Sequence, residues 1–137
     1  MRLLGIDFGS VRIGVAVGET EVRIASPRPA LDARGSIKAD AEQVLQLARR
    51  EEVQRIVVGI PEQDEAESRQ ARVCRMLIER LTELGADAVG VDESYTSVES
   101  EAALRETDLK ASERRKRRDG EAACRILERY FRVLDEA

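Results

Sequence analysis

Residues 3–17, Leu-Leu-Gly-Ile-Asp-Phe-Gly-Ser-Val-Arg-Ile-Gly-Val-Ala-Val, decide how this chain folds. An apolar run at 3–6 and a second run at 11–17 flank the turn-forming pair Gly9-Ser10. Short apolar runs on either side of a glycine-first dipeptide are typical of two antiparallel strands joined by a tight turn. The chain therefore begins with a predicted β-hairpin.

Asp7 lies at the end of the first predicted strand. A two-residue loop would place it opposite Arg12 and would place Gly5 opposite Gly14. Side chains alternate between the two faces of a strand, so Asp7 shares a largely buried face with Leu3. An ionised carboxylate there costs several kcal/mol unless a cation or hydrogen bonds hold it. Two explanations are open: Asp7 pairs with Arg12 or with turn amides, or it coordinates a metal ion.

The composition describes one domain with a highly charged surface. The 137 residues are 42% apolar and 36% charged, and a chain of this length buries roughly two thirds of its unfolded surface in one core. We expect a single domain over residues 1–137. No apolar stretch approaches the roughly 20 residues of a membrane span, so we expect a cytoplasmic protein with no membrane partner. The two cysteines, Cys74 and Cys124, are expected to be reduced core thiols.

The chain contains no histidine. Its absence excludes Ser-His-Asp and Cys-His catalysis as well as histidine-ligated zinc. Catalysis would have to come from carboxylates, Lys, Arg, hydroxyl groups or hard cations such as Mg²⁺ or Mn²⁺.

Beyond the hairpin, the apolar periodicity alternates between strands and helices. The predicted order is a third strand from 22–25 that ends in the Pro27/Pro29 region, a helix opened by Gly35-Ser36, a strand at 55–60, a helix ending at Gly85, a strand at 88–91, a helix at 98–105 and a last helix from about Asp119. This order predicts an α/β fold in which helices pack against a mixed sheet.

Three acids, Asp7, Glu93 and Asp119, occupy positions that suit a metal site. The first two follow apolar strands at their carboxyl ends, the edge where open α/β sheets bind ligands. Asp119 heads the apolar face of the last helix. Three converging carboxylates can hold two divalent cations about 3.5–4 Å apart, and such a pair cleaves phosphodiesters. The alternatives are a solvated loop acid at 93 and a helix N-cap at 119.

Residues 109–118 hold six basic side chains and one acidic side chain, within a chain of net charge −4. A concentrated cationic segment on an acidic body favours binding to a phosphate backbone. Because the segment is polar, it is also consistent with a solvated helix face, or with a loop that orders only when substrate binds.

Several motifs resemble one known family. Residues 4–16 resemble the opening motif of the YqgF/RuvX family, the Holliday-junction-resolvase-like proteins of the RNase H-like superfamily. Later blocks match in order: Val57–Pro61, Asp92-Glu93 with Thr96, and Asp119–Ala123 with Ile126-Leu127. The resemblance covers essentially the whole chain and implies an RNase H-like fold, a five-stranded mixed sheet of order 3-2-1-4-5 with helices on both faces.

The resemblance also implies a function. It implies that Asp7, Glu93 and Asp119 are the catalytic acids and the metal ligands of a nuclease that matures the 5′ end of pre-16S rRNA in the bacterial cytoplasm. Its cofactor would be Mg²⁺ or Mn²⁺, two ions being expected. Structured RNA is the expected partner, with a ribosomal precursor particle or branched DNA as further partners. The side chains expected to bind substrate are Ser10, Arg12, Thr96, Lys110, Arg114, Arg115, Lys116 and Arg117.

Two segments depart from the family pattern. Residues 62–66, Glu-Gln-Asp-Glu-Ala, stand where an Asn-x-Asp-Gly-like stretch is usual, and Ser94 replaces a usual basic residue. Neither departure touches the three acids, but both bear on how substrate is gripped.

Three other functions are open. The same site would suit a Holliday junction resolvase, which needs paired active sites and hence a homodimer, whereas a monomer favours RNA. A ribosome-assembly factor would keep the fold and bind RNA, but would not cut it. The first motif also resembles the phosphate loop of actin-like ATPases and sugar kinases, but those proteins need two such domains.

Overall fold

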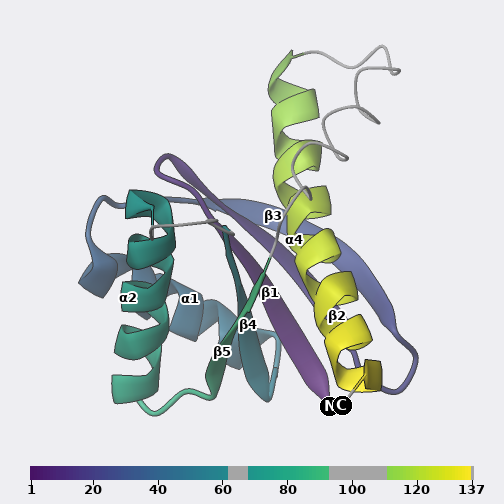
Figure 1. The fold of residues 1–137 in the computed structure, drawn as a ribbon. Coiled ribbons are helices and arrows are strands. Elements are labelled where there is room, and N and C mark those ends of the chain that lie inside the picture. The colour runs from purple at the N-terminus through teal and green to yellow at the C-terminus, as the bar shows by residue number, and fades with distance from the viewer. Residues whose placement is uncertain (62–67, 93–110, 137) are drawn as a thin grey trace.

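A computed structural model describes residues 1–61, 68–92 and 111–136, and of residues 111–117 it describes the backbone only. Five strands form one sheet with α1 and α2 on one face and α4 on the other (Figure 1). The elements are β1 (Arg2–Phe8), β2 (Arg12–Glu19), β3 (Ile24–Asp32), α1 (Ile37–Arg50), β4 (Arg55–Ile60), α2 (Arg69–Glu83), β5 (Ala88–Asp92) and α4 (Ala111–Glu136). The strand order β3-β2-β1-β4-β5 confirms the predicted order, and the predicted helix at 98–105 lies outside the described residues.

The hairpin register differs from the prediction by two residues. Asp7 pairs with Gly14 rather than with Arg12, and Gly5 pairs with Ala16. The strands leave residues 9–11 between them, and the Gly9 N–H donates to the carbonyl oxygen of Arg12 at 3.0 Å, so the turn is centred on Ser10 and Val11 rather than on Gly9 and Ser10. A shift by an even number of residues leaves each side chain on its predicted face. The prediction that Asp7 lies on a largely covered face is therefore unaffected.

β3 continues past the point where it was predicted to end. It runs from Ile24 to Asp32 through both Pro27 and Pro29. Proline cannot donate a ladder hydrogen bond, but β3 is the edge strand, where one side of the backbone has no partner strand. The register also shifts opposite Gly14, where two residues of β3 stand against one residue of β2. This bulge is a second position that tolerates proline.

Two apolar cores lie on the two faces of the sheet. One lies between the sheet and the helices α1 and α2, and the other lies between the sheet and α4. Ser36 and Ser68 cap α1 and α2, each accepting a hydrogen bond from the N–H three residues later. Cys74 and Cys124 are both buried thiols, and burial raises the pKa of the Cys124 thiol to about 11. Within the described ranges, no helix combines the length and the apolar character that crossing a membrane requires.

α4 begins at Ala111, eight residues before the predicted start at Asp119. Asp119 therefore lies inside the helix, and the proposed N-cap at this position is wrong. The backbone of residues 111–118 is helical, so most of the basic segment forms the first two turns of α4 rather than a loop. Its residue types explain this extension, because Ala, Glu, Arg and Lys are all strong helix formers.

Candidate active site

Asp7 and Asp119 meet at Gly14. The first acid is on β1, the glycine is directly opposite it on β2, and the second acid is on α4 where this helix crosses the hairpin. A Cβ atom added at Gly14 would lie 2.3 Å from the main-chain oxygen of Asp119 and 3.2 Å from Cβ of Asp7. Only glycine leaves room for such an approach. The structure thus brings together two of the three acids that the sequence singles out.

Arg12 contributes the nearest positive charge. Its Nε donates to Oδ2 of Asp119 at 2.5 Å, and the two side chains are 29% and 17% exposed. A charge-assisted hydrogen bond in a partly covered position is stronger than one on the open surface. The sequence expected this arginine opposite Asp7 or on substrate, and it gave no sign of a partner 107 residues away.

The third acid, Glu93, lies outside the described residues. Continued by one residue, the parallel register sets Asp7 level with Gly59 on β4 and with Val91 on β5. β5 ends one residue later at Asp92, which Glu93 follows directly. Only β4 separates β1 from β5, so the two strand ends lie about 10 Å apart at the usual strand spacing.

The acids that are described suit a hard cation. Mg²⁺ and Mn²⁺ prefer oxygen ligands, and carboxylates supply them. In residues 1–61, 68–92 and 111–136, no group of three His, Cys, Asp or Glu side chains is placed to hold a metal ion. Asp7 and Asp119 are two of the three acids predicted to hold a metal ion, and the third, Glu93, lies outside the described residues.

The residues expected to bind substrate are divided among three places. Arg12 lies beside the acids, whereas Ser10 lines a pocket on the opposite face of the sheet. The backbone positions of Arg114, Arg115, Lys116 and Arg117 lie on the first turns of α4. Thr96 and Lys110 lie outside the described residues.

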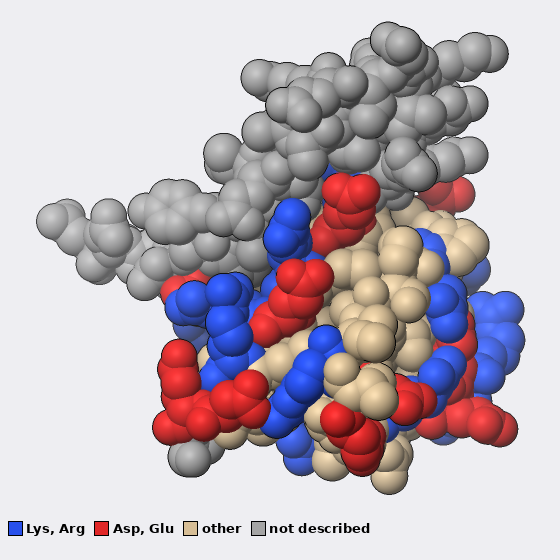
Figure 2. Space-filling view, turned by 90° about the vertical axis from the view of Figure 1, so that its right-hand side faces the viewer, with Lys and Arg blue, Asp and Glu red and all other residues tan. Residues whose placement is uncertain are grey.

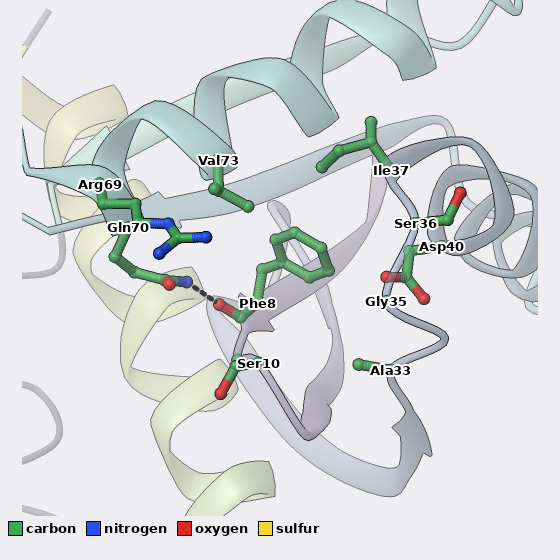
Figure 3. Close-up of a pocket in the computed structure, with 11 residues that line it drawn as sticks. Phe8, Ser10, Ala33, Gly35, Ser36, Ile37, Asp40, Arg69, Gln70 and Val73 are labelled. Carbon is green, nitrogen blue, oxygen red and sulfur yellow. Dashed lines mark hydrogen bonds between the residues drawn. The ribbon is translucent and has the colours of Figure 1, made fainter.

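The pocket that includes Ser10 has a volume of about 600 Å³ and lies between the first turns of α1 and α2. Figure 3 shows Arg69 and Gln70 on one side of the Phe8 ring and Asp40 on the other side. Sequence reasoning did not identify Asp40, although there was a signal. Its position falls on the apolar stripe of the helix that it belongs to, yet it carries a carboxylate and is only 2% exposed.

Charges of both signs are mixed over the side of the molecule that Figure 2 shows. Basic and acidic side chains lie next to one another over its described part. A mixed surface provides little long-range attraction for a polyanion. The candidate for such attraction is residues 109–118, which hold six basic side chains and one acidic side chain and lead into α4.

Comparison with known proteins identifies the family. The family model "RuvX: Holliday junction resolvase" matches residues 1–133. A relative from Anaeromyxobacter dehalogenans (strain 2CP-C), named "Putative pre-16S rRNA nuclease", is 38% identical over 133 residues and covers 96% of each chain. A relative of the same name from Thermus thermophilus is 35% identical over 132 residues, covering 96% of this chain and 97% of its own.

Solved structures with low sequence identity share the fold. Thermus thermophilus RuvC in complex with a Holliday junction substrate has a TM-score of 0.61 at 14% identity and covers 100% of this chain and 97% of its own. The yeast mitochondrial Holliday junction resolvase Ydc2 has a TM-score of 0.58 at 11% identity and covers 98% and 79%. These matches confirm the predicted RNase H-like architecture. The match of the family model, together with relatives that align over nearly the whole chain, shows that this protein belongs to the RuvX family.

Proposed function

We propose that this protein is a divalent-metal-dependent endonuclease that acts on structured RNA, in the maturation of the 5′ end of pre-16S rRNA. The observation that carries the proposal is the meeting of Asp7 and Asp119 across Gly14, at the edge of the sheet that the end of β5 also reaches. The names of the relatives support the substrate, since both relatives described above are named for pre-16S rRNA.

The proposed mechanism assigns each acid a role. Asp7, Asp119 and Glu93 would hold Mg²⁺ or Mn²⁺, which when bound supplies an activated water and stabilises the leaving oxygen of the phosphodiester. Gly14 allows the first two carboxylates to share one site, because any larger residue there would push α4 outward. Arg12 orients the Asp119 carboxylate and is close enough to this acid to contact a phosphate bound there.

The first turns of α4 supply the proposed grip on the phosphate backbone. Positions 115 and 116 lie one helical turn before Asp119, on the same side of the helix. A phosphate backbone held by this segment would therefore lie beside the acids. Such contacts read no sequence, so they would position the RNA without selecting it.

A second candidate is cleavage of four-way DNA junctions. The description of the family model favours it, and the fold is shared with a resolvase that was solved on a junction. Resolution of a junction requires two active sites and hence a homodimer. An RNA-binding assembly factor without catalysis is the third candidate, and it predicts binding without cleavage.

The deciding experiment compares three substrates in Mn²⁺: a pre-16S rRNA fragment, a four-way DNA junction and an unbranched RNA duplex. We expect the rRNA fragment to be cut fastest, and Asp7→Asn to abolish the cutting while RNA binding persists. Glu42→Gln is the matched control, because it neutralises one exposed acid on α1, away from the proposed site. Preferred cutting of the junction by a dimer would replace RNA with DNA as the substrate. Binding without cleavage in any metal would refute the nuclease proposal.

A further inference from the structure

The pocket between α1 and α2 lies back to back with the proposed active site. Asp7 and Phe8 are consecutive in β1, so their side chains project from opposite faces of the sheet at the same edge. Asp7 faces α4, and Phe8 lines the pocket on the other side. The connection between β1 and β2 contributes Gly9 and Ser10 to the pocket rim. A strand that crosses this edge would therefore touch both sites within a short length.

Asp40 is the most unusual group in the pocket. It is 2% exposed, and both hydrogen bonds that its side chain accepts, from the Arg34 N–H at 2.8 Å and the Gln43 amide at 2.9 Å, end on Oδ1. No hydrogen bond from the described residues reaches Oδ2. Oδ2 is not among the fully enclosed, unsatisfied atoms of the described residues, so it keeps some accessible surface in a residue that lines the pocket and can accept a hydrogen bond from water or from a ligand. The pocket therefore offers one fixed, negatively charged acceptor.

Most of the other side chains that line the pocket are of two kinds, apolar side chains and polar side chains from the start of α2. Phe8, Ile37 and Val73 form apolar walls that can cover a flat ring. Arg69 lies across the pocket from Asp40 (Figure 3), and it makes no ion pair with any described residue. Gln70 is held in place because its Nε2 donates to the carbonyl oxygen of Phe8. The volume of about 600 Å³ is within the range of about 300–1,000 Å³ that small-molecule sites span.

We propose that this pocket binds one nucleotide of the substrate strand, with an amino-bearing base on Asp40 and its phosphate on Arg69. The inference rests on the proposed function, because it adds a nucleotide subsite beside the acids. Cytosine, adenine and guanine carry exocyclic amino groups that can donate to Oδ2 of Asp40. Uracil has no amino group and can donate only its ring N3–H, which is flanked by two carbonyl oxygens that repel the carboxylate, so uracil is disfavoured. Single-stranded bases are commonly read in this way, through their polar edges and between apolar side chains.

The test titrates the ¹⁵N-labelled full chain with CMP, AMP, GMP and UMP in metal-free buffer. We expect the amide signals of Ser36, Ile37, Asp40 and Gln70 to shift. CMP should bind about tenfold more tightly than UMP, because UMP has no amino group and offers the carboxylate only a ring N–H flanked by two carbonyl oxygens. Asp40→Asn should reverse this preference, since its amide oxygen can keep the Oδ1 bonds while its NH₂ group faces the base. Glu42→Gln, the same charge change on the same helix outside the pocket, should leave the preference unchanged.

A second pair of variants tests the phosphate end without disturbing Asp40. Arg69→Gln should weaken all four nucleotides about equally and should leave the binding of cytidine, which has no phosphate, unchanged. Arg72→Gln, an exposed arginine on the same helix that does not line the pocket, should have no effect. A short oligocytidylate should bind more tightly than CMP if the natural ligand is a strand, whereas equal binding would indicate a free nucleotide and overturn the inference.

The failure of this inference is distinguishable from failure of the nuclease proposal. Unshifted pocket amides, or equal affinities for CMP and UMP in the parent chain, would overturn the nucleotide pocket even if RNA is cut. These two results need no variant, so they hold even if Asp40→Asn does not fold. Conversely, Asp7→Asn should bind nucleotides as the parent chain does, because its side chain lies on the other face of the sheet.

Discussion

Arg12 and Asp119 are joined by a hydrogen bond of 2.5 Å between Nε and Oδ2, although 107 residues separate them. The guanidinium of Arg12 is thus hydrogen-bonded to Asp119, a carboxylate that the proposed metal site needs. At the proposed site, a metal ion would compete with Arg12 for the same oxygen, and a substrate phosphate would compete with Asp119 for Arg12. The pair would then link binding of RNA to the availability of the acid.

Removing this guanidinium should change metal binding and RNA binding in opposite directions. In Arg12→Gln we expect Mn²⁺ to bind about tenfold more tightly in the absence of nucleic acid, because a charge-assisted hydrogen bond no longer opposes it. RNA should bind more weakly, because a phosphate contact is lost. Calorimetric titration with Mn²⁺ measures the first effect. Arg23→Gln, which breaks a distant ion pair between the β2–β3 turn and Asp135 on α4, is the control and should leave Mn²⁺ affinity unchanged.

The three acids should be equivalent for cleavage but not for stability. Asp7→Asn, Glu93→Gln and Asp119→Asn should each slow RNA cleavage by at least about 100-fold, since each removes a ligand of the proposed cations. Asp119→Asn should also lower the free energy of unfolding by about 1 kcal/mol because it weakens the pair with Arg12. Asp7→Asn should be neutral or stabilising in metal-free buffer, where it relieves repulsion between acids. Cleavage assays and urea titrations check these outcomes, and unchanged cleavage in all three variants would refute the metal site.

A methyl group at Gly14 should displace α4. Gly14→Ala places Cβ against the main chain of Asp119, which cannot rotate away. We expect a loss of about 1–3 kcal/mol in the free energy of unfolding, together with weaker Mn²⁺ binding. Gly90→Ala is the control, because its new Cβ would meet only side-chain ends, first that of Ile60, which can move. If Gly14→Ala and Gly90→Ala change Mn²⁺ binding equally, Gly14 has no specific role in the proposed metal site.

The basic turns of α4 should contribute affinity that depends on salt. Changing Arg114, Arg115, Lys116 and Arg117 to Ala should weaken binding to unrelated RNA sequences about equally and flatten the dependence on salt. Alanine preserves helix propensity, so α4 should remain helical by circular dichroism. If affinity and salt slope are both unchanged, this segment is a solvated helix face and the grip lies elsewhere.

Glu51 should make stability depend on pH at the opposite end of the sheet. Hydrogen bonds from Arg28 at 2.9 Å and Arg2 at 3.0 Å lower the pKa of its carboxyl group, with the Arg28 bond as the larger cause. The contribution is present above the ordinary pKa of a glutamate and is lost as the pH falls through the lowered value. Glu51→Gln should therefore cost about 1 kcal/mol at pH 7 and almost nothing near the bottom of the acid transition. Urea titrations over this pH range provide the measurement, and a constant difference would exclude the ionic contribution.

Local rules predicted much of the fold. The faces of the hairpin follow from the alternation of side chains, and Ser36 and Gly85 mark the ends of helices through capping and a positive φ of 92° at Gly85. The same local rules did not predict the hairpin register, because the register depends on the hydrogen bond that the Gly9 N–H donates in the turn. β3 continued through its prolines because of its place at the sheet edge, a tertiary property that a local rule does not contain.

The site was predictable only where chain position determines geometry. Asp7 could be identified because a charged residue ends an apolar strand, and its approach to Asp119 follows from the fold that the motifs imply. The ion pair of Arg12 could not be identified, since it depends on how α4 packs across the sheet. The burial of Asp40 could have been inferred from its place on the apolar stripe of α1, but its hydrogen bonds to Arg34 and Gln43 could not. Whether Glu93 completes the acid set stays a prediction.

The place of α4 in the chain has a consequence during protein synthesis. Asp7 and Gly14 leave the ribosome early, but α4 is the last of the described elements to be made, and it contributes Asp119 and one whole side of the second core. A nascent chain can form its hairpin well before this helix emerges. The proposed catalytic centre cannot assemble until translation has passed it. An incomplete chain, still attached to the ribosome that makes it, would thus be unable to cut RNA.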